Sequence, residues 1–506
     1  MGVMRFLIDP LPSGGDWPEA WRSYISGFDG RVFPTRVEFE GNVMLCRRQS
    51  PDSGRLHVAW PVAGRGRPLL FTTSLREQEA PYILAVELAR GKLSQVRDQL
   101  GSWQLAGMPV PDEFYKPFRA AHRALAKAVA AQDRPAEAGE LAEQALEESL
   151  RAADFLVQTY TRLRLTVRRR KSPQLPASLG CHLGQITLDR PEMKGFGNIF
   201  NSAQATVSWK LIEPVEGTYN WELPDAQLEF IRENKLLASA GPLLDFAAGG
   251  LPEWLSRWDQ DLLNLQSFVS DFIETAISRY EGRIRRWEIA AYPNTGGALA
   301  LNEEKRLRLV ARMLEVARQA DQDLQMMIRV AQPWGEYQAR GQHQLSPLQF
   351  VDALLRSGSG LSEVTLEIAA GFQPLGTAPR DLLDLSQLID SWTSLGVPLN
   401  VVMAVPAQTA PLDPLAAEDL EVDSAGKSHF WTPARQAEWI ERTLPVLLSK
   451  QSVVSTSWLH YSDAVPHRFP HAGLISADGI PRPGLAVFSS FRQDYWESAS
   501  EADTVV

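Results

Sequence analysis

Cysteine is scarce in this chain. Cys46 and Cys181 are the only two among 506 residues, they lie far apart, and neither belongs to a CxxC pair. A disulfide framework or a cysteine zinc site would need several closely spaced cysteines. The sequence therefore favours neither, and we expect both thiols to be free and buried.

An excess of positive charge and long apolar runs are also missing. The formal net charge is −10, and an acidic surface repels phosphate backbones. We therefore expect no nucleic-acid partner. No apolar run reaches the roughly 18 residues of a membrane span, and the first residues lack the pattern of a secretory signal. These absences predict a cytoplasmic protein without a membrane partner.

The pattern of apolar residues divides the chain into parts. Short β-rich runs at 36–45, 55–60 and 68–72 lie in a β-rich module, residues 1–110. Helical periodicity then predicts a helical hairpin over residues 111–170. The basic run 162–171 (RLRLTVRRRK) is typical of a solvated linker or strand, and KSPQLPAS at 171–178 marks a domain boundary.

After this boundary, short apolar runs alternate with amphipathic segments. The runs at 237–246, 283–290, 324–330, 363–368, 399–405 and 453–458 are typical of buried strands, and 263–280, 303–319 and 433–449 of helices. Such alternation predicts an α/β fold, either an eight-stranded (β/α)8 TIM barrel or an open doubly wound sheet. A glycine-rich phosphate loop after the first strand is lacking, which weakens the doubly wound interpretation.

One segment carries a family resemblance. Residues 200–234 (FNSAQATVSWKLIEPVEGTYNWELPDAQLEFIREN) resemble the second barrel strand and following loop of glycoside hydrolase family 10, best known as endo-β-1,4-xylanases. Seven residues fall in register with the family pattern: Trp209, Ile212, Glu213, Pro214, Gly217, Tyr219 and Asp225.

The resemblance extends over residues 178–494. GPLLDFAAGGLPEW at 241–254 resembles strand three, RWEIAAYPN at 286–294 strand four, LGVPLNVVMAV at 395–405 strand seven, and 457–485 strand eight with its tail. The resemblance thus implies a (β/α)8 barrel over 178–494, preceded by the β-rich and helical N-terminal region. We expect residues 495–506 to form a flexible tail.

The two carboxylates that the family chemistry needs are both replaced. Retaining glycosidases use a carboxylic acid and a carboxylate nucleophile on opposite sides of the sugar. Matched residue by residue, the acid/base position of the family is Tyr292 and the nucleophile position is Met403. Methionine has no ionisable group, and a phenol has a pKa near 10. The resemblance therefore implies a barrel without its inherited reaction.

Other sugar-binding positions are lost as well. The histidine of strand six becomes Ala369, and the tryptophan and histidine of strand three become Phe246 and Ala247. We expect the reactive pocket to be refilled. Asp245 and Glu367 are the candidates for relocated carboxylates, because a charge at an apolar strand end needs a partner or a purpose. Glu288 is expected to point away from them, toward the helices.

Several residues remain candidates for substrate binding. Trp209, Gln332, Trp334 and Trp458 fall at strand ends and loops of the predicted barrel, where tryptophan rings could stack on sugars. Packing beneath the loops is the alternative for each tryptophan. The segment 460–471 holds three histidines and Asp463, but its spacing matches no common zinc motif. We expect no metal and no cofactor.

Three functional hypotheses follow. The first is a catalytically inactive family 10-like barrel that binds an oligo- or polysaccharide, or a protein. The second is an active glycosidase, hydrolysing O-glycosyl bonds with relocated carboxylates. The third is a structural or assembly role, in which the N-terminal region pairs with a second copy of the chain or with a protein partner.

Overall fold

The computed structural model describes residues 2–9, 17–172, 174–341, 343–409, 413–423 and 430–497. Most of the predicted tail, residues 498–506, lies outside this range. Its first residues belong to a π-helical turn, Gln493–Glu497, in which Trp496 is buried and donates to the carbonyl of Ala177 at 3.1 Å. That start of the tail is therefore packed against the barrel. Both cysteines are free and buried, as expected.

The N-terminal region contains two four-stranded sheets. One has the order β4-β5-β1-β8 and the other β3-β2-β6-β7. The strands are β1 (Gly2–Leu7), β2 (Tyr24–Ser26), β3 (Val32–Phe33), β4 (Arg36–Glu40), β5 (Val43–Arg48), β6 (Arg55–Ala59), β7 (Leu69–Phe71) and β8 (Tyr82–Ile83). The run 36–45, predicted as one strand, is a hairpin, because Gly41 turns the chain at a φ of +62°.

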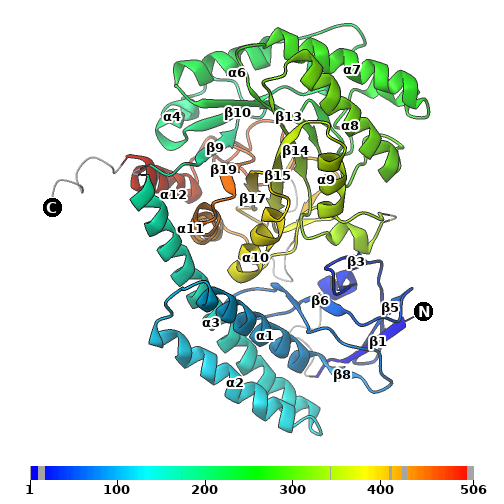
Figure 1. The fold of residues 1–506 in the computed structure, drawn as a ribbon, viewed down its shortest axis with the longest axis vertical. Coiled ribbons are helices and arrows are strands. Elements are labelled where there is room, and N and C mark those ends of the chain that lie inside the picture. Colours follow the sequence, from blue (N-terminus) through cyan, green and yellow to red (C-terminus); the bar gives the residue numbers. More distant parts are fainter. Residues whose placement is uncertain are drawn as a thin grey trace, which may run out of the picture.

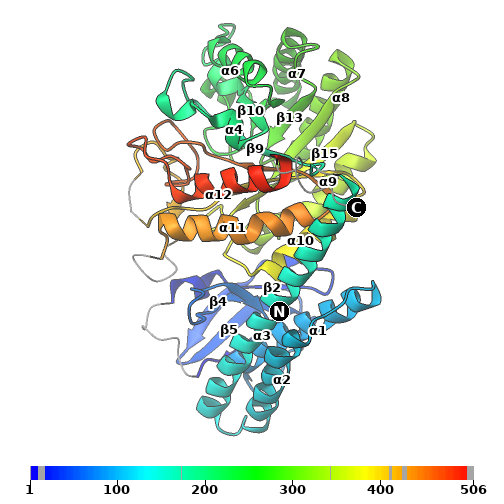
Figure 2. The same cartoon turned by 90° about the vertical axis from the view of Figure 1, so that its left-hand side faces the viewer.

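Three helices follow the sheets: α1 (Leu84–Leu105), α2 (Tyr115–Ala130) and α3 (Pro135–Lys171). Figures 1 and 2 show α3 running from beside α2 up to the barrel. The basic run predicted as a linker or strand is the end of α3, where positive charge complements the helix dipole. Its Arg168 is buried and donates to the carbonyls of Leu448 and Lys450 at 2.7 Å. This contact ties the helix to the barrel.

The second half of the described chain forms a closed (β/α)8 barrel, which confirms the predicted fold. Its eight parallel strands close because β11 pairs with β13. The strands are β9 (Ser178–His182), β10 (Ser202–Thr206), β11 (Leu237–Gly241), β13 (Arg286–Ala291), β14 (Gln325–Val330), β15 (Leu361–Ala369), β17 (Leu399–Ala404) and β19 (Val453–Trp458). The run 237–246 is broken at Gly241, and β12 (Leu244–Asp245) follows it.

Helices cover the outside of the barrel (Figure 1). The larger ones are α6 (Glu222–Glu233), α7 (Leu262–Arg279), α8 (Glu303–Ala320), α9 (Pro347–Arg356), α10 (Leu382–Thr393), α11 (Pro433–Ser449) and α12 (Pro483–Arg492). None of the helices in the described part of the chain combines the length and apolar character that a membrane crossing requires. Leucine-rich faces of these helices pack on outward-facing strand residues and form the main core.

The N-terminal sheets lie against the carboxyl-end loops of the barrel. The amide of Leu69 donates to the carbonyl of Pro379 at 2.8 Å, and Arg22 pairs with Asp423 at 2.9 Å. Arg380 donates to the hydroxyl of Tyr24 at 2.9 Å. Because TIM-barrel enzymes build their sites at this end of the strands, the N-terminal region covers part of the face where a site is expected.

Candidate functional site

The inside of the barrel is polar. Strand alternation turns Glu363, Thr365 and Glu367 of β15 inward, and Asn400 of β17 lies beside Thr365 in the ladder. Arg286 on β13 donates to both Glu363 (2.6 Å) and Asn400 (2.8 Å) across this lower layer. A void of about 30 Å³ lies among the side chains of this layer, which is room for a water molecule rather than a sugar.

Arg329 of β14 is the hub of the upper layer. Its guanidinium donates to Oε1 of Glu288 (Nε at 3.0 Å) and lies 3.5 Å from Oε2 of Glu367. It also lies 5.4 Å from the ring centre of Tyr292. Arg329, Glu288 and Glu367 are all buried. A buried charge is tolerated when it is paired and hydrogen-bonded, and here one guanidinium serves two carboxylates.

Burial and charge act in opposite directions on the two carboxyl groups. Burial raises the pKa of Glu288 and of Glu367, and the positive charge of Arg329 opposes this effect in each. For both groups the net direction is upward. Burial also raises the pKa of the Tyr292 hydroxyl well above its ordinary value, and the charge of Glu367 adds to this. Tyr292 is therefore a neutral hydrogen-bond donor at neutral pH.

Tyr292, at the acid/base position, takes part in this network. Its hydroxyl donates to Oε2 of Glu367 at 2.6 Å, and the guanidinium of Arg468 stacks 4.7 Å from its ring centre. The residue is 3% exposed and has a φ of +59°, a conformation that non-glycine residues seldom adopt. The ring thus fills the position from which a family acid would act on a sugar.

Met403, at the nucleophile position, faces away from the barrel interior. Asn400 contacts Arg286 and Glu363 inside the barrel, and the unbroken pairing of β17 with β15 then turns Val402 and Ala404 inward and Met403 outward. Met403 belongs to the core shared with the outer helices. The match of Met403 to the nucleophile position stays a prediction. Neither inward neighbour can ionise, so the strand offers no carboxylate here.

The relocated-carboxylate candidates differ in their surroundings. Glu367 is bound to Tyr292 and Arg329. Asp245 is half-buried, and its Oδ1 accepts from the amide of Ala247 at 2.8 Å. The prediction that Glu288 packs toward the helices is wrong, because it binds Arg329 inside the barrel. Alternation along β13 places Glu288 on the same face as Arg286, whose side chain also points into the barrel, and the bulge of this strand follows only after Glu288.

Two of the predicted stacking tryptophans are enclosed. Trp209 is 1% exposed, stacks on Phe272 with ring centres 4.8 Å apart, and donates to Glu213 at 2.7 Å. Trp458 is 0% exposed and donates to the carbonyl of Ala472 at 2.9 Å. Neither ring has an open face. Their sugar-stacking role stays a prediction, and their burial favours the packing alternative.

The other two candidates lie near a cavity of about 260 Å³ between the N-terminal sheets and the barrel loops. Gln332 lines this cavity. Trp334 is half-buried, and the guanidinium of Arg380 stacks 4.5 Å from its ring centre. Their role in binding stays a prediction. Of the residues proposed from sequence, Gln332 is the one that the structure places on this cavity.

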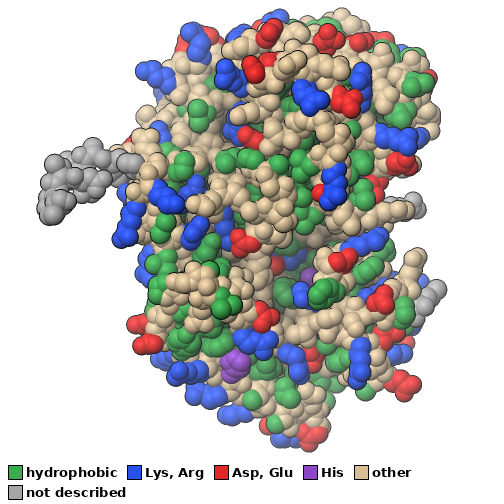
Figure 3. Space-filling view, in the orientation of Figure 1, with side chains coloured by type: hydrophobic (Ala, Val, Ile, Leu, Met, Phe, Trp, Pro, Cys, Tyr) green, Lys and Arg blue, Asp and Glu red, His purple; other side chains and the backbone are tan. Residues whose placement is uncertain are grey.

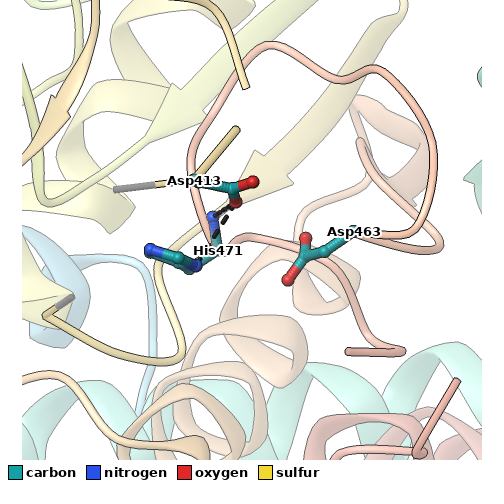
Figure 4. Close-up of side chains that lie close together, drawn as sticks. All are labelled: Asp413, Asp463 and His471. Atoms are coloured by element: carbon teal, nitrogen blue, oxygen red, sulfur yellow. Dashed lines mark hydrogen bonds and ion pairs between the residues drawn. The ribbon is translucent and has the colours of Figure 1, made fainter. Parts of the chain in front are cut away.

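Asp413, Asp463 and His471 bring ligand atoms within 4.8 Å of one another (Figure 4). Each already has protein partners. Asp413 Oδ2 accepts from His467 at 3.0 Å and from the amide of His471 at 2.8 Å. Asp463 pairs with Arg482 at 2.7 Å. A cation inside the cluster disfavours a metal ion, and these contacts instead tie two loops together.

Part of the barrel is similar in sequence to known proteins. Residues 190–328 match the family model "Glycosyl hydrolase family 10". Endo-1,4-beta-xylanase B of Thermotoga neapolitana is 25% identical over 83 residues, which is 16% of this chain and 23% of that protein's length. The barrel is glycoside hydrolase family 10-like. The family match covers part of this barrel, and the chain spans about a quarter of the length of the xylanase that it matches.

Solved structures are similar to part of this chain. Native xylanase 10B from Thermotoga maritima has a TM-score of 0.48 and 15% identity, over 64% of this chain and 97% of that one. GH10 from Paenibacillus barcinonensis has a TM-score of 0.48 and 17% identity, over 65% of this chain and 96% of that one.

Two arginines of the site were missed from sequence. Arg329 and Arg468 both lie near the ring of Tyr292, yet the sequence singled out neither as a candidate. One signal was available for Arg329, since a lone cation within the apolar run 324–330 (LQMMIRV) must find buried carboxylates. Arg468 lies in a loop, where the sequence offers no comparable signal.

Proposed function

We propose that the family 10-like barrel is catalytically inactive and acts as a binding module for carbohydrate or protein. The observation that carries this proposal is the buried network of Tyr292, Glu367 and Arg329. A retaining glycosidase needs one proton-donating carboxylic acid and one free carboxylate, with room for a sugar between them. The strand-four position here holds a phenol, and the nearby carboxylate of Glu367 is paired.

The proposal includes the surroundings in which the barrel works. With a cytoplasmic location, which stays a prediction, long extracellular polysaccharides would not reach the protein. Imported oligosaccharides or endogenous glycans would be the available carbohydrate ligands. Pairing of the N-terminal region with another protein or a second copy of the chain stays a further prediction.

An activity assay tests the proposal. The full-length protein is incubated with xylan and xylo-oligosaccharides, and released reducing ends are measured for the wild type and for Glu367→Gln and Asp245→Asn. We expect wild-type release equal to that of the heat-denatured protein. Wild-type turnover that falls at least 100-fold in either variant would instead establish a hydrolase with relocated carboxylates. Thermal unfolding of each variant shows that a lost activity is not a lost fold.

A further inference from the structure

We propose that the cavity between the N-terminal sheets and the barrel loops binds a small, neutral, polyhydroxylated ligand of one or two sugar rings. This inference rests on the proposed binding function and names its place. The cavity adjoins the Tyr292–Glu367 network, since the amide of its lining residue Gly296 donates to the carbonyl of Tyr292 at 2.8 Å, and about a quarter of its lining comes from the N-terminal region. Figure 3 shows a hollow between the barrel above and the N-terminal sheets below.

The walls suit a small ligand with both apolar and polar faces. Leu69 from β7 and Phe372, Leu375 and Ala378 from the loop after β15 supply apolar surface. A volume of about 260 Å³ is at the lower end of known ligand sites. Apolar walls with a few fixed polar groups are the usual composition of such sites.

Three buried oxygen atoms on this cavity lack a hydrogen-bond partner within the described residues. They are Oε1 of Glu19, Oε1 of Gln332 and Oε2 of Glu336. Glu19 is 5% exposed and Gln332 is 3% exposed. Leaving a buried acceptor unpaired costs about 1–3 kcal/mol, so three on one cavity indicate a ligand that donates hydrogen bonds.

The position of the Gln332 oxygen is set by its neighbours. Its Nε2 lies 3.3 Å from the carbonyl of Pro374 and 3.1 Å from that of Gly376. Both partners are acceptors, so the amide nitrogen must face them and Oε1 is the free atom. The backbone of Gln332 has a φ of +46°. Such strained residues cluster at ligand sites.

The charges favour a neutral ligand over a cationic one. Glu19 already pairs with Arg67 at 2.6 Å, and Glu336 with Arg380 at 3.0 Å. An arginine therefore balances the charge of each carboxylate, and the second oxygen of each carboxylate lacks only a hydrogen-bond donor. Arg340 also lines the cavity, and it has no ion-pair partner in the described chain, so it can donate to ligand oxygens. Hydroxyl groups of a ligand can donate to the carboxylate oxygens and also accept from Arg340.

Both halves of the site are held in place before a ligand arrives. Arg22 on the N-terminal side pairs with Asp423 of the barrel at 2.9 Å, and both line the cavity. Arg380 joins Tyr24 of β2 to Glu336 of the loop after β14. Preorganised walls reduce the entropy that binding must overcome.

Calorimetric titration of the full chain with xylose, xylobiose and cellobiose tests the site. Gln332→Met removes the free acceptor together with the two hydrogen bonds of Nε2, whereas Ala378→Leu narrows the cavity without removing a side-chain hydrogen-bonding group. We expect binding of at least one of these sugars by the wild type and at least tenfold weaker binding by each variant. Gln132→Met and Ala136→Leu make the same changes at exposed positions of the helical hairpin, and they should bind like the wild type.

The outcomes separate this inference from the proposed function. Sugar binding that is unchanged in both cavity variants would overturn the cavity as the site while leaving a carbohydrate-binding module. No heat with any of the three sugars, or binding of putrescine in their place, would overturn the ligand class. Catalytic turnover would overturn the proposed inactivity without touching the cavity. Thermal unfolding of Ala378→Leu near the wild-type temperature shows that lost binding is not lost folding.

Discussion

At the scale of single residues, Arg329 matters most to the barrel interior. Two carboxylates, Glu288 and Glu367, depend on its guanidinium for charge balance, and Tyr292 adds a hydroxyl to the same network. A network in which every member is paired orders its residues, whereas a partly paired one is costly. Tyr292, at the position matched to the family acid, is thus held within this buried network.

Replacing Arg329 should therefore destabilise the protein strongly. Arg329→Met leaves Glu288 buried without a cation and Glu367 with only the charge of Arg468 nearby, and removing one partner of a buried pair typically costs about 3–5 kcal/mol. Urea unfolding followed by tryptophan fluorescence measures the loss. Arg312→Met, on an exposed face of α8, is the matched control and should change the stability by less than about 0.5 kcal/mol. Equal unfolding midpoints for the two variants would contradict the role of the network.

At the scale of elements, two loops on the carboxyl side of the barrel are fastened by charge. Asp413 lies in the loop after β17, while His467 and His471 lie in the loop after β19. Burial lowers the pKa of His467, but the hydrogen bond to Asp413, the hydrogen bond to the carbonyl of Val465 and the nearby carboxylates together outweigh it, and the pKa is raised overall. Burial raises the pKa of Asp413, but its hydrogen bonds from His467 and the amide of His471 and the charges of these histidines together bring the pKa below its ordinary value.

These directions give the contact a pH dependence. The raised pKa of His467 contributes stability that is complete below pH about 6.5 and is lost as the pH rises through the folded-state pKa. The lowered pKa of Asp413 contributes stability above pH about 4 that is lost in acid. We expect His467→Gln to cost about 1.5–3 kcal/mol between these limits and less at pH 8.5.

Melting temperatures of the wild type and His467→Gln, measured from pH 5 to 9, check this prediction. Asp463, His460, His471 and Arg482 surround the pair and are present in both proteins, so the difference between the two curves isolates His467. His122→Gln, at an exposed position of α2, should follow the wild type throughout. A gap between the curves that widens with rising pH would contradict the assigned direction.

At the scale of the whole molecule, the N-terminal region is bound to the barrel through buried charges. Lys92 of α1 donates to Asp381 at 2.6 Å, and both side chains are almost fully buried. Asp381 also caps α10 by accepting from the amides of Leu383 and Asp384. An unpaired charge at this contact would be costly, so we expect the two parts to unfold together.

A double-mutant cycle measures this coupling. Lys92→Met should cost about 3–5 kcal/mol, because it leaves Asp381 buried without a cation. Asp381→Asn keeps a side chain that caps helices well while removing the charge, so the double variant should recover part of the loss. Urea unfolding gives the coupling energy, with Lys127→Met on the exposed face of α2 as control. Additive losses would show that the pair does not join the two parts.

The sequence by itself determined the barrel and led to the prediction that the family carboxylates are replaced. Strands alternating with amphipathic helices, together with the motif in residues 200–234, are local patterns that follow from periodicity and spacing. Methionine has no ionisable group, so the lack of a carboxylate at position 403 could be read from the sequence alone. The outward direction of the Met403 side chain does not change that conclusion.

Only the tertiary structure decided which side chains meet. Glu288 of β13 meets Arg329 of β14 inside the barrel, and the register of β17 turned Met403 outward, because a shift of one residue in a strand reverses the face of every side chain. Trp209 and Trp458 became core residues through neighbours distant in sequence. The cavity at Gln332 exists because the N-terminal sheets pack on loops some 300 residues away, a contact with no local signal in the chain.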